Sequence, residues 1–181
     1  HQALCAVPHR GGMSSEGVGD GAGISVDLSL KFFRKVTGLD LEPGAFGVGN
    51  FFLPADPNEH ERATNIINET LDDWAGFEVV QVRDVPVNND ASGDRAVKWQ
   101  LPIRQWVFMA PEGLRGAKLD RRVHEALLAI ESIAYTDEAL SGLYPLSLSA
   151  RMQVFKGRLN SWEIIPYYKD LSDSDHEVHT M

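Results

Sequence analysis

Apolar residues recur along this chain with two spacings, one typical of helices and one of strands. In two stretches they recur every three to four positions, which predicts helices with one buried face at residues 57–74 and 120–135. Those faces comprise Ala63, Ile66, Ile67, Leu71 and Trp74 in the first helix and Val123, Leu127, Ile130 and Ile133 in the second. Shorter apolar runs predict strands at residues 46–53, 77–82 and 103–109, and one or two more within residues 146–155.

The order of these elements indicates the fold class. Strand, helix, strand, strand, helix and strand follow one another within residues 44–150, as in a split βαβ sandwich, where two helices cover one face of an antiparallel sheet. Upstream we expect the end of a helix at residues 1–7, a glycine-dense loop, a strand at residues 24–28 and a short helix at residues 30–36. The class is therefore α+β, and this order alone carries no function.

Composition narrows the function further. The net charge of −9 argues against a nucleic-acid partner, because such surfaces gather lysine and arginine. A single cysteine excludes a disulfide framework and a thiolate-rich metal site. No apolar run reaches the roughly 20 residues of a membrane helix, and residues 1–7 lack the features of a signal peptide, so a cytoplasmic location is expected.

The glycine-dense loop is the strongest local signal. It runs from His9-Arg10-Gly11-Gly12 to Gly19-Asp20-Gly21-Ala22-Gly23. A dinucleotide loop would follow a strand and open a helix, whereas this loop leads into a strand, and no Lys-Ser or Lys-Thr pair follows as in a phosphate loop. Composition alone favours a structural turn.

Several short motifs carry a resemblance to a known family. In order, they include Ala3-Leu4-Cys5, His9-Arg10-Gly11, Gly19-Asp20-Gly21-Ala22-Gly23-Ile24, Arg83-Asp84-Val85-Pro86-Val87, Pro102-Ile103-Arg104-Gln105, Val154-Phe155-Lys156-Gly157 and Tyr167-Tyr168-Lys169-Asp170-Leu171. Together they resemble the opening region of the glutamate synthase large subunit, a class II glutamine amidotransferase of the N-terminal-nucleophile hydrolase type. The resemblance implies an αββα sandwich, of which residues 1–181 are expected to form a single incomplete domain.

The resemblance also implies a reaction. A cysteine at the mature N-terminus attacks the side-chain amide of glutamine, and its own α-amine acts as general base, since that amine titrates near neutrality. The ammonia passes to a synthase domain or subunit that aminates 2-oxoglutarate, with FMN and an iron–sulfur cluster in the parent enzyme. No cofactor is expected in this chain, and Cys5 lies in the wrong place for the nucleophile. That nucleophile, and the arginine that holds the glutamine carboxylate, are expected outside this chain, which alone should be inactive.

Four residues are candidates for the active-site loop. Arg10 could orient the nucleophile's backbone while Gly11 lets the loop pass close, and the alternative is an arginine bonded to carbonyls of its own loop. Asp20, followed by Gly21, could fix the loop through side-chain bonds to backbone N–H groups.

The C-terminal histidines and the fold class each allow another interpretation. His176 and His179, near two aspartates, suit a metal by residue type, but two ligands three residues apart rarely form a site without a third, and no metal is expected. The alternative function is a non-catalytic regulatory or small-ligand-binding module with a ferredoxin-like fold.

Overall fold

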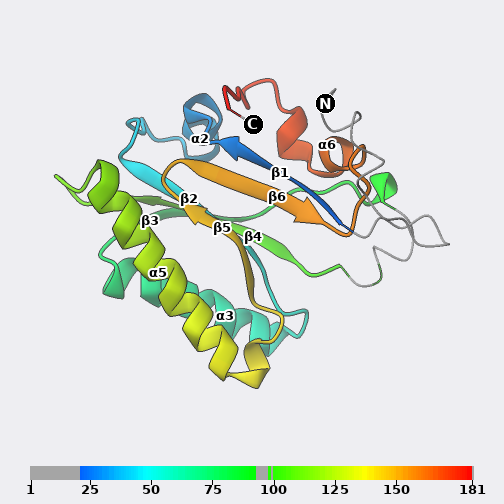
Figure 1. Cartoon of the computed structure of the whole chain (residues 1–181), viewed down its shortest axis with the longest axis horizontal. Helices are drawn as coiled ribbons and strands as arrows, with labels where there is room; N and C mark the ends of the chain where they lie inside the picture. Colours follow the sequence, from blue (N-terminus) through cyan, green and yellow to red (C-terminus); the bar gives the residue numbers. More distant parts are fainter. Residues whose placement is uncertain (1–20, 93–97, 99, 181) are drawn as a thin grey trace.

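A four-stranded antiparallel sheet forms the centre of the molecule (Figure 1). The computed structural model describes residues 21–92, 98 and 100–180. The strands are β2 (Phe46–Phe52), β3 (Glu78–Asp84), β4 (Ile103–Met109) and β5 (Tyr144–Ser149), in the order β3-β4-β2-β5. Helices α3 (Pro57–Glu69) and α5 (Gly116–Thr136) lie side by side on one face of this sheet. The expected β-α-β-β-α-β order is therefore confirmed.

Helix α3 begins as its sequence predicts but ends differently. Asp56 caps it by accepting hydrogen bonds from two backbone N–H groups, and Pro57 occupies the first turn. The last turn, Thr70–Trp74, is a π-helix, which contains more residues per turn and so rotates the side chains that follow. Trp74 is 49% exposed as a result, and Ala75 is buried in its place. The prediction that Trp74 lies on the buried face was wrong.

Helix α5 buries a slightly different face from the one expected. Its core residues are Leu119, Val123, Ala126 and Ile130, spaced four, three and four positions apart. A further step of four positions, in place of three, leads to Ala134, which packs against the core. Ile133 is 39% exposed, so its predicted place on the buried side was wrong, because it lies one position before that stripe.

A second, two-stranded sheet packs against the other face of the central sheet. It pairs β1 (Ala22–Asp27) with β6 (Met152–Gly157) in antiparallel register. The short helices α2 (Leu30–Thr37) and α6 (Ile164–Tyr167) flank it (Figure 1). Apolar side chains from β1, β6 and α6 form one core with Val85 and Ile103, and α2 buries its phenylalanines against β2 and β4.

The chain passes from one sheet to the other in two residues. Residues 146–155 form parts of two strands, and β5 and β6 belong to different sheets. At the corner, the Ser149 hydroxyl accepts hydrogen bonds from the N–H groups of Arg151 and Met152, and the Arg151 guanidinium pairs with Asp120 of α5. This corner joins both sheets and the helical layer.

Some expectations fall outside the described residues, and two elements near the C-terminal end of the sequence were not expected. The helix predicted at residues 1–7 and most of the glycine-dense loop lie outside the described part of the chain. The apolar spacing of the sequence did not predict helix α6 or the 3-10 turn Lys169–Ser172. Among the described residues no helix has both the length and the apolar character that a membrane span requires.

Candidate functional site

Only one of the four predicted loop residues can be placed. Arg10, Gly11 and Asp20 lie outside the described residues, as does Cys5. Gly21 is described, and its φ of 152° belongs to the region that residues with a side chain rarely adopt. It stands immediately before β1 and contributes to the wall of a cavity.

This cavity, the β1 cavity, has a volume of about 580 Å³. Its lining comprises Gly21, Ala22, Gly23, Ile24, Ser25, Phe52, Tyr144, Val154, Lys156, Gly157 and Arg158. These residues come from both sheets and from the loop after β6. Three of the lining residues are glycines. Much of the wall is therefore backbone without side chains, which a ligand can approach closely.

The close approach of β1 and β6 explains one of these glycines. Gly23 lies opposite Lys156 in the register of the two strands. A Cβ atom at Gly23 would lie 2.8 Å from the Cβ atom of Lys156 and 3.2 Å from the carbonyl oxygen of Phe155. Only glycine fits there without displacing the backbone of β6.

Lys156 supplies a fixed positive charge to the β1 cavity. Its Nζ donates a hydrogen bond to the Tyr144 hydroxyl at 2.9 Å and lies 4.5 Å from the centre of the Tyr144 ring. Within the described residues no carboxylate pairs with Lys156 or with Arg158. The described part of the lining thus carries two cations and no acidic residue, although the chain has a net charge of −9.

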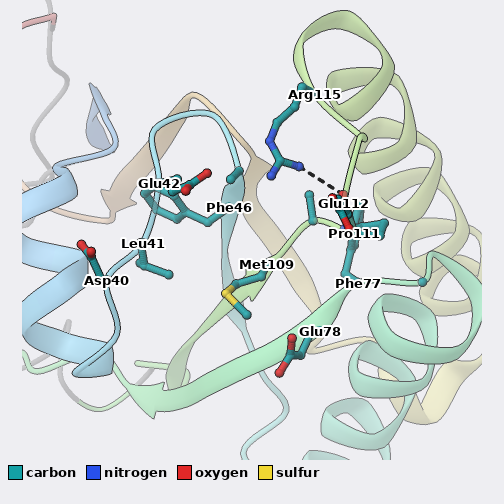
Figure 2. Close-up of a pocket in the computed structure, with 13 residues that line it drawn as sticks. Asp40, Leu41, Glu42, Phe46, Phe77, Glu78, Met109, Pro111, Glu112 and Arg115 are labelled. Carbon is teal, nitrogen blue, oxygen red and sulfur yellow. Dashed lines mark hydrogen bonds between the residues drawn. The ribbon is translucent and has the colours of Figure 1, made fainter.

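A second cavity, of about 490 Å³, has the opposite charge (Figure 2). Its wall includes the acidic residues Asp40, Glu42, Glu78 and Glu112. Figure 2 shows the Arg115 side chain extending toward Pro111, whose carbonyl oxygen accepts a hydrogen bond from Nη1 at 3.1 Å. Neither of the two buried side-chain atoms that lack a hydrogen-bond partner in the described residues, Ser161 Oγ and His176 Nδ1, belongs to the lining of this cavity.

Between the two sheets lies a buried network of polar side chains that sequence reasoning missed. Arg83 pairs with Asp170 and donates from Nε to Gln105 at 2.8 Å. Gln105 donates to Asn50 at 2.8 Å and to Gln153 at 3.3 Å. The sequence contained a signal for this network, because amide side chains at inward-facing positions of a strand need hydrogen-bond partners. The network also joins the Arg83-Asp84 and Asp170-Leu171 motifs, which are far apart in the sequence.

His176 ends this network and is not arranged as a metal ligand. Its Nε2 lies 2.9 Å from Nε2 of Gln153, and its ring contacts Phe32 and Phe155. Burial lowers the pKa of His176, so the imidazole is neutral near pH 7. His179 is exposed, and no group of three or more potential metal ligands occurs in the described residues.

Comparison with known proteins decides the family. The family described as "Glutamine amidotransferases class-II" matches this sequence over residues 1–181. The chain belongs to the class II glutamine amidotransferases. An α+β fold with antiparallel sheets is consistent with the N-terminal-nucleophile hydrolase architecture of class II amidotransferases.

The class II amidotransferases most similar to this chain include glutamate synthases. It is 32% identical to the large chain of the NADPH glutamate synthase of Azospirillum brasilense in an alignment of 180 residues that covers 97% of this chain and 12% of that protein. It is 34% identical to the ferredoxin-dependent glutamate synthase 2 of Synechocystis over 178 residues, or 95% of this chain and 11% of that protein. The chain therefore spans about a tenth of the length of these curated relatives.

Proposed function

We propose that this chain is part of the glutamine-hydrolysing domain of a glutamate synthase-like enzyme. The observation that carries the proposal is the family match over the whole sequence, together with similarity to glutamate synthases. The enzyme converts glutamine to glutamate and ammonia, and a synthase domain or subunit adds that ammonia to 2-oxoglutarate. The 181 residues alone are inactive in this proposal.

In this proposal the glycine-dense loop belongs to the active site. A cysteine thiolate outside this chain attacks the glutamine side-chain carbonyl, the C–N bond breaks, and ammonia leaves with the proton that the α-amine took from the thiol. Water then hydrolyses the thioester and releases glutamate. Arg10 orients the nucleophile's backbone, Gly11 allows the close approach, and Asp20 with Gly21 fixes the loop where β1 begins.

Electron transfer belongs to another part of the enzyme. An iron–sulfur cluster needs several thiolate ligands, and this chain has one cysteine. The iron–sulfur cluster of the parent enzyme therefore does not fit the residues of this chain, and no step of glutamine hydrolysis depends on the cluster or on FMN.

The test uses a longer protein that contains this chain and hydrolyses glutamine. Arg10→Ala should lower turnover by about one to two orders of magnitude, because misplacing a reacting group by about 1 Å can cost on the order of a hundredfold. Its thermal midpoint should fall only slightly. Cys5→Ser is the matched control and should leave turnover unchanged.

Two results would overturn parts of this proposal. Unchanged turnover per folded Arg10→Ala molecule would remove Arg10 from the active site, and loss of turnover in folded Cys5→Ser would make Cys5 the nucleophile. If no longer protein containing the chain hydrolyses glutamine, the non-catalytic alternative replaces the proposal.

A further inference from the structure

The outward side of helix α5 carries a stripe of exposed residues that forms the α5 face. The stripe is spaced three, four, three and four positions apart and comprises Arg121, His124, Leu128, Glu131 and Tyr135. This is the spacing of a seam between two paired helices. Leu128 is two positions from the core residues Ala126 and Ile130, so the face lies on the side of the helix away from the sheet. Figure 1 shows α5 in the layer of helices beyond the central sheet.

Two large side chains of the α5 face are in contact with water. Leu128 is 51% exposed and Tyr135 is 93% exposed. A single exposed apolar residue is ordinary on a protein surface, but these two lie seven positions apart on one line of one helix. A partner that covers both must be long and narrow, since the 21 residues of α5 span about 31 Å. A second helix has that shape.

The charges along α5 indicate which helix fits. Residues 116–124 carry three cations, Lys118, Arg121 and Arg122, and the one carboxylate among them, Asp120, pairs with Arg151. Residues 125–138 carry four carboxylates and no cation. Each end of the helix therefore bears the sign of charge that its own dipole disfavours. A second copy of α5 that runs in the opposite direction would place its acidic half beside this basic half, so the charges of both copies would be complementary.

A two-fold axis at Leu128 gives the two copies a consistent register. The two Leu128 side chains then meet, and positions equally far before and after Leu128 lie opposite each other. Arg121, whose Nε donates to Glu125 at 3.0 Å, comes to lie opposite Tyr135 of the second copy, where the planar guanidinium can stack on the ring. His124 comes to lie beside Glu131 of the second copy. Within the described residues Glu131 has no ion pair of its own.

We propose that the α5 face binds the same face of a second copy of this chain, as an antiparallel pair of helices about Leu128. The inference is independent of the proposed function, because no residue of the α5 face takes part in glutamine hydrolysis. A contact made by one helix from each copy is smaller than the roughly 800 Å² per partner of a stable complex. We therefore expect a weak dimer with a dissociation constant of about 1–100 µM.

Sedimentation velocity of the full chain over a concentration series of about 1–500 µM measures this association. Leu128→Glu brings two carboxylates together at the axis and removes the burial of Leu128, so the dissociation constant should rise at least about tenfold. Leu39→Glu is the matched control, at a leucine outside α5 that is 41% exposed, and should leave the dissociation constant unchanged. A chain that stays monomeric throughout the series would overturn the proposal and leave the α5 face to another part of a longer protein.

Exchange of two charges tests the register. His124→Glu places a carboxylate beside Glu131 of the second copy and should weaken the dimer several-fold, whereas the double variant His124→Glu with Glu131→Lys should restore it. Within one copy these residues are seven positions apart, about 10 Å along the helix, so recovery requires contact between copies. Thermal midpoints should change little, because every substituted position is exposed. A dimer that is insensitive to Leu128→Glu, or a double variant without recovery, would overturn the α5 pair.

Discussion

Gly47 of β2 lies directly under an aromatic ring of the core, where a side chain has no room. The Phe108 ring of the neighbouring strand covers Gly47, and it also stacks on Phe77 with ring centres 4.6 Å apart. A Cβ atom at Gly47 would lie 2.3 Å from Cζ of Phe108, which is far inside van der Waals contact. The absence of a side chain at this position is therefore a packing requirement of the helix-covered face.

Gly47→Ala should destabilise the fold by about 1–3 kcal/mol, the usual cost of inserting a methyl group into a filled core. Urea unfolding monitored by tryptophan fluorescence measures the change. The double variant Gly47→Ala with Phe108→Leu should lose less stability than the sum of the two single variants, because the smaller side chain makes room. Additive losses would show that Phe108 does not cause the strain.

Residue patterns predicted most elements but not the contacts between them. Apolar spacing identified α3 and α5 because each buries one face on the sheet, and it misplaced Trp74 because a π-helical turn interrupts the regular rotation. The pairing of Lys156 with Tyr144 had no local signal, since their strands belong to different sheets. The loop residues Arg10, Gly11 and Asp20 stay predictions, as they lie outside the described residues.

At the scale of elements, the segment of residues 173–180 is held on α2 and β1. Lys35 of α2 contacts both Asp173 and Asp175, and the Ser29 hydroxyl donates to the carbonyl of Asp175 and accepts from the N–H of Glu177. The N–H of Asp175 and then Lys35 lower the pKa of Asp173, and Lys35 with Lys31 lowers the pKa of Asp175. The two carboxylates are 27% exposed and Lys35 is 53% exposed, so water screens each ion pair and each is weak alone.

Acid should release this segment from α2. A carboxylate whose pKa is lower in the folded state stabilises that state above its ordinary pKa of 3.8, and the contribution is lost as the pH falls through the lowered value. The backbone NMR resonance of Glu177 should therefore move toward its unstructured position only below about pH 4. In Lys35→Met the midpoint should rise toward 3.8, whereas Lys118→Met should not change it. A midpoint insensitive to Lys35→Met would contradict this account.

For the molecule as a whole, the buried polar network is the main link between the two sheets besides apolar packing. Its side chains come from β2, β3, β4, β6 and the C-terminal region. Each side chain therefore finds its hydrogen-bond partner only when these elements are folded together. The Asp170 side chain is only 6% exposed and that of Arg83 18%. Little water can therefore reach this pair, and it replaces Asp170 poorly as the partner of Arg83 if the carboxylate is removed.

Asp170→Asn should destabilise the protein by about 3–5 kcal/mol, because it leaves a buried guanidinium without its counter-charge. Asp120→Asn is the matched control: it removes the partner of Arg151 at an exposed ion pair and should change stability by less than about 1 kcal/mol. Urea unfolding of the two variants compares them directly. Equal losses of stability in the two variants would show that the buried ion pair stabilises the protein no more than the exposed one.

The corner at residues 150–151 fixes one end of the β1–β6 pair. Arg151 fixes that end to α5, while Asp27 and Met152 lie beside it in the register. Rotation about a pivot produces displacements that grow with distance, and the opposite end of the pair is about 17 Å away, five residues at roughly 3.4 Å each. Gly157 and the start of β1 stand at that far end, where the Tyr168 hydroxyl restrains the carbonyl of Lys156. An angular change at Arg151 would therefore displace the wall of the β1 cavity most at this far end, although Arg151 does not line the cavity.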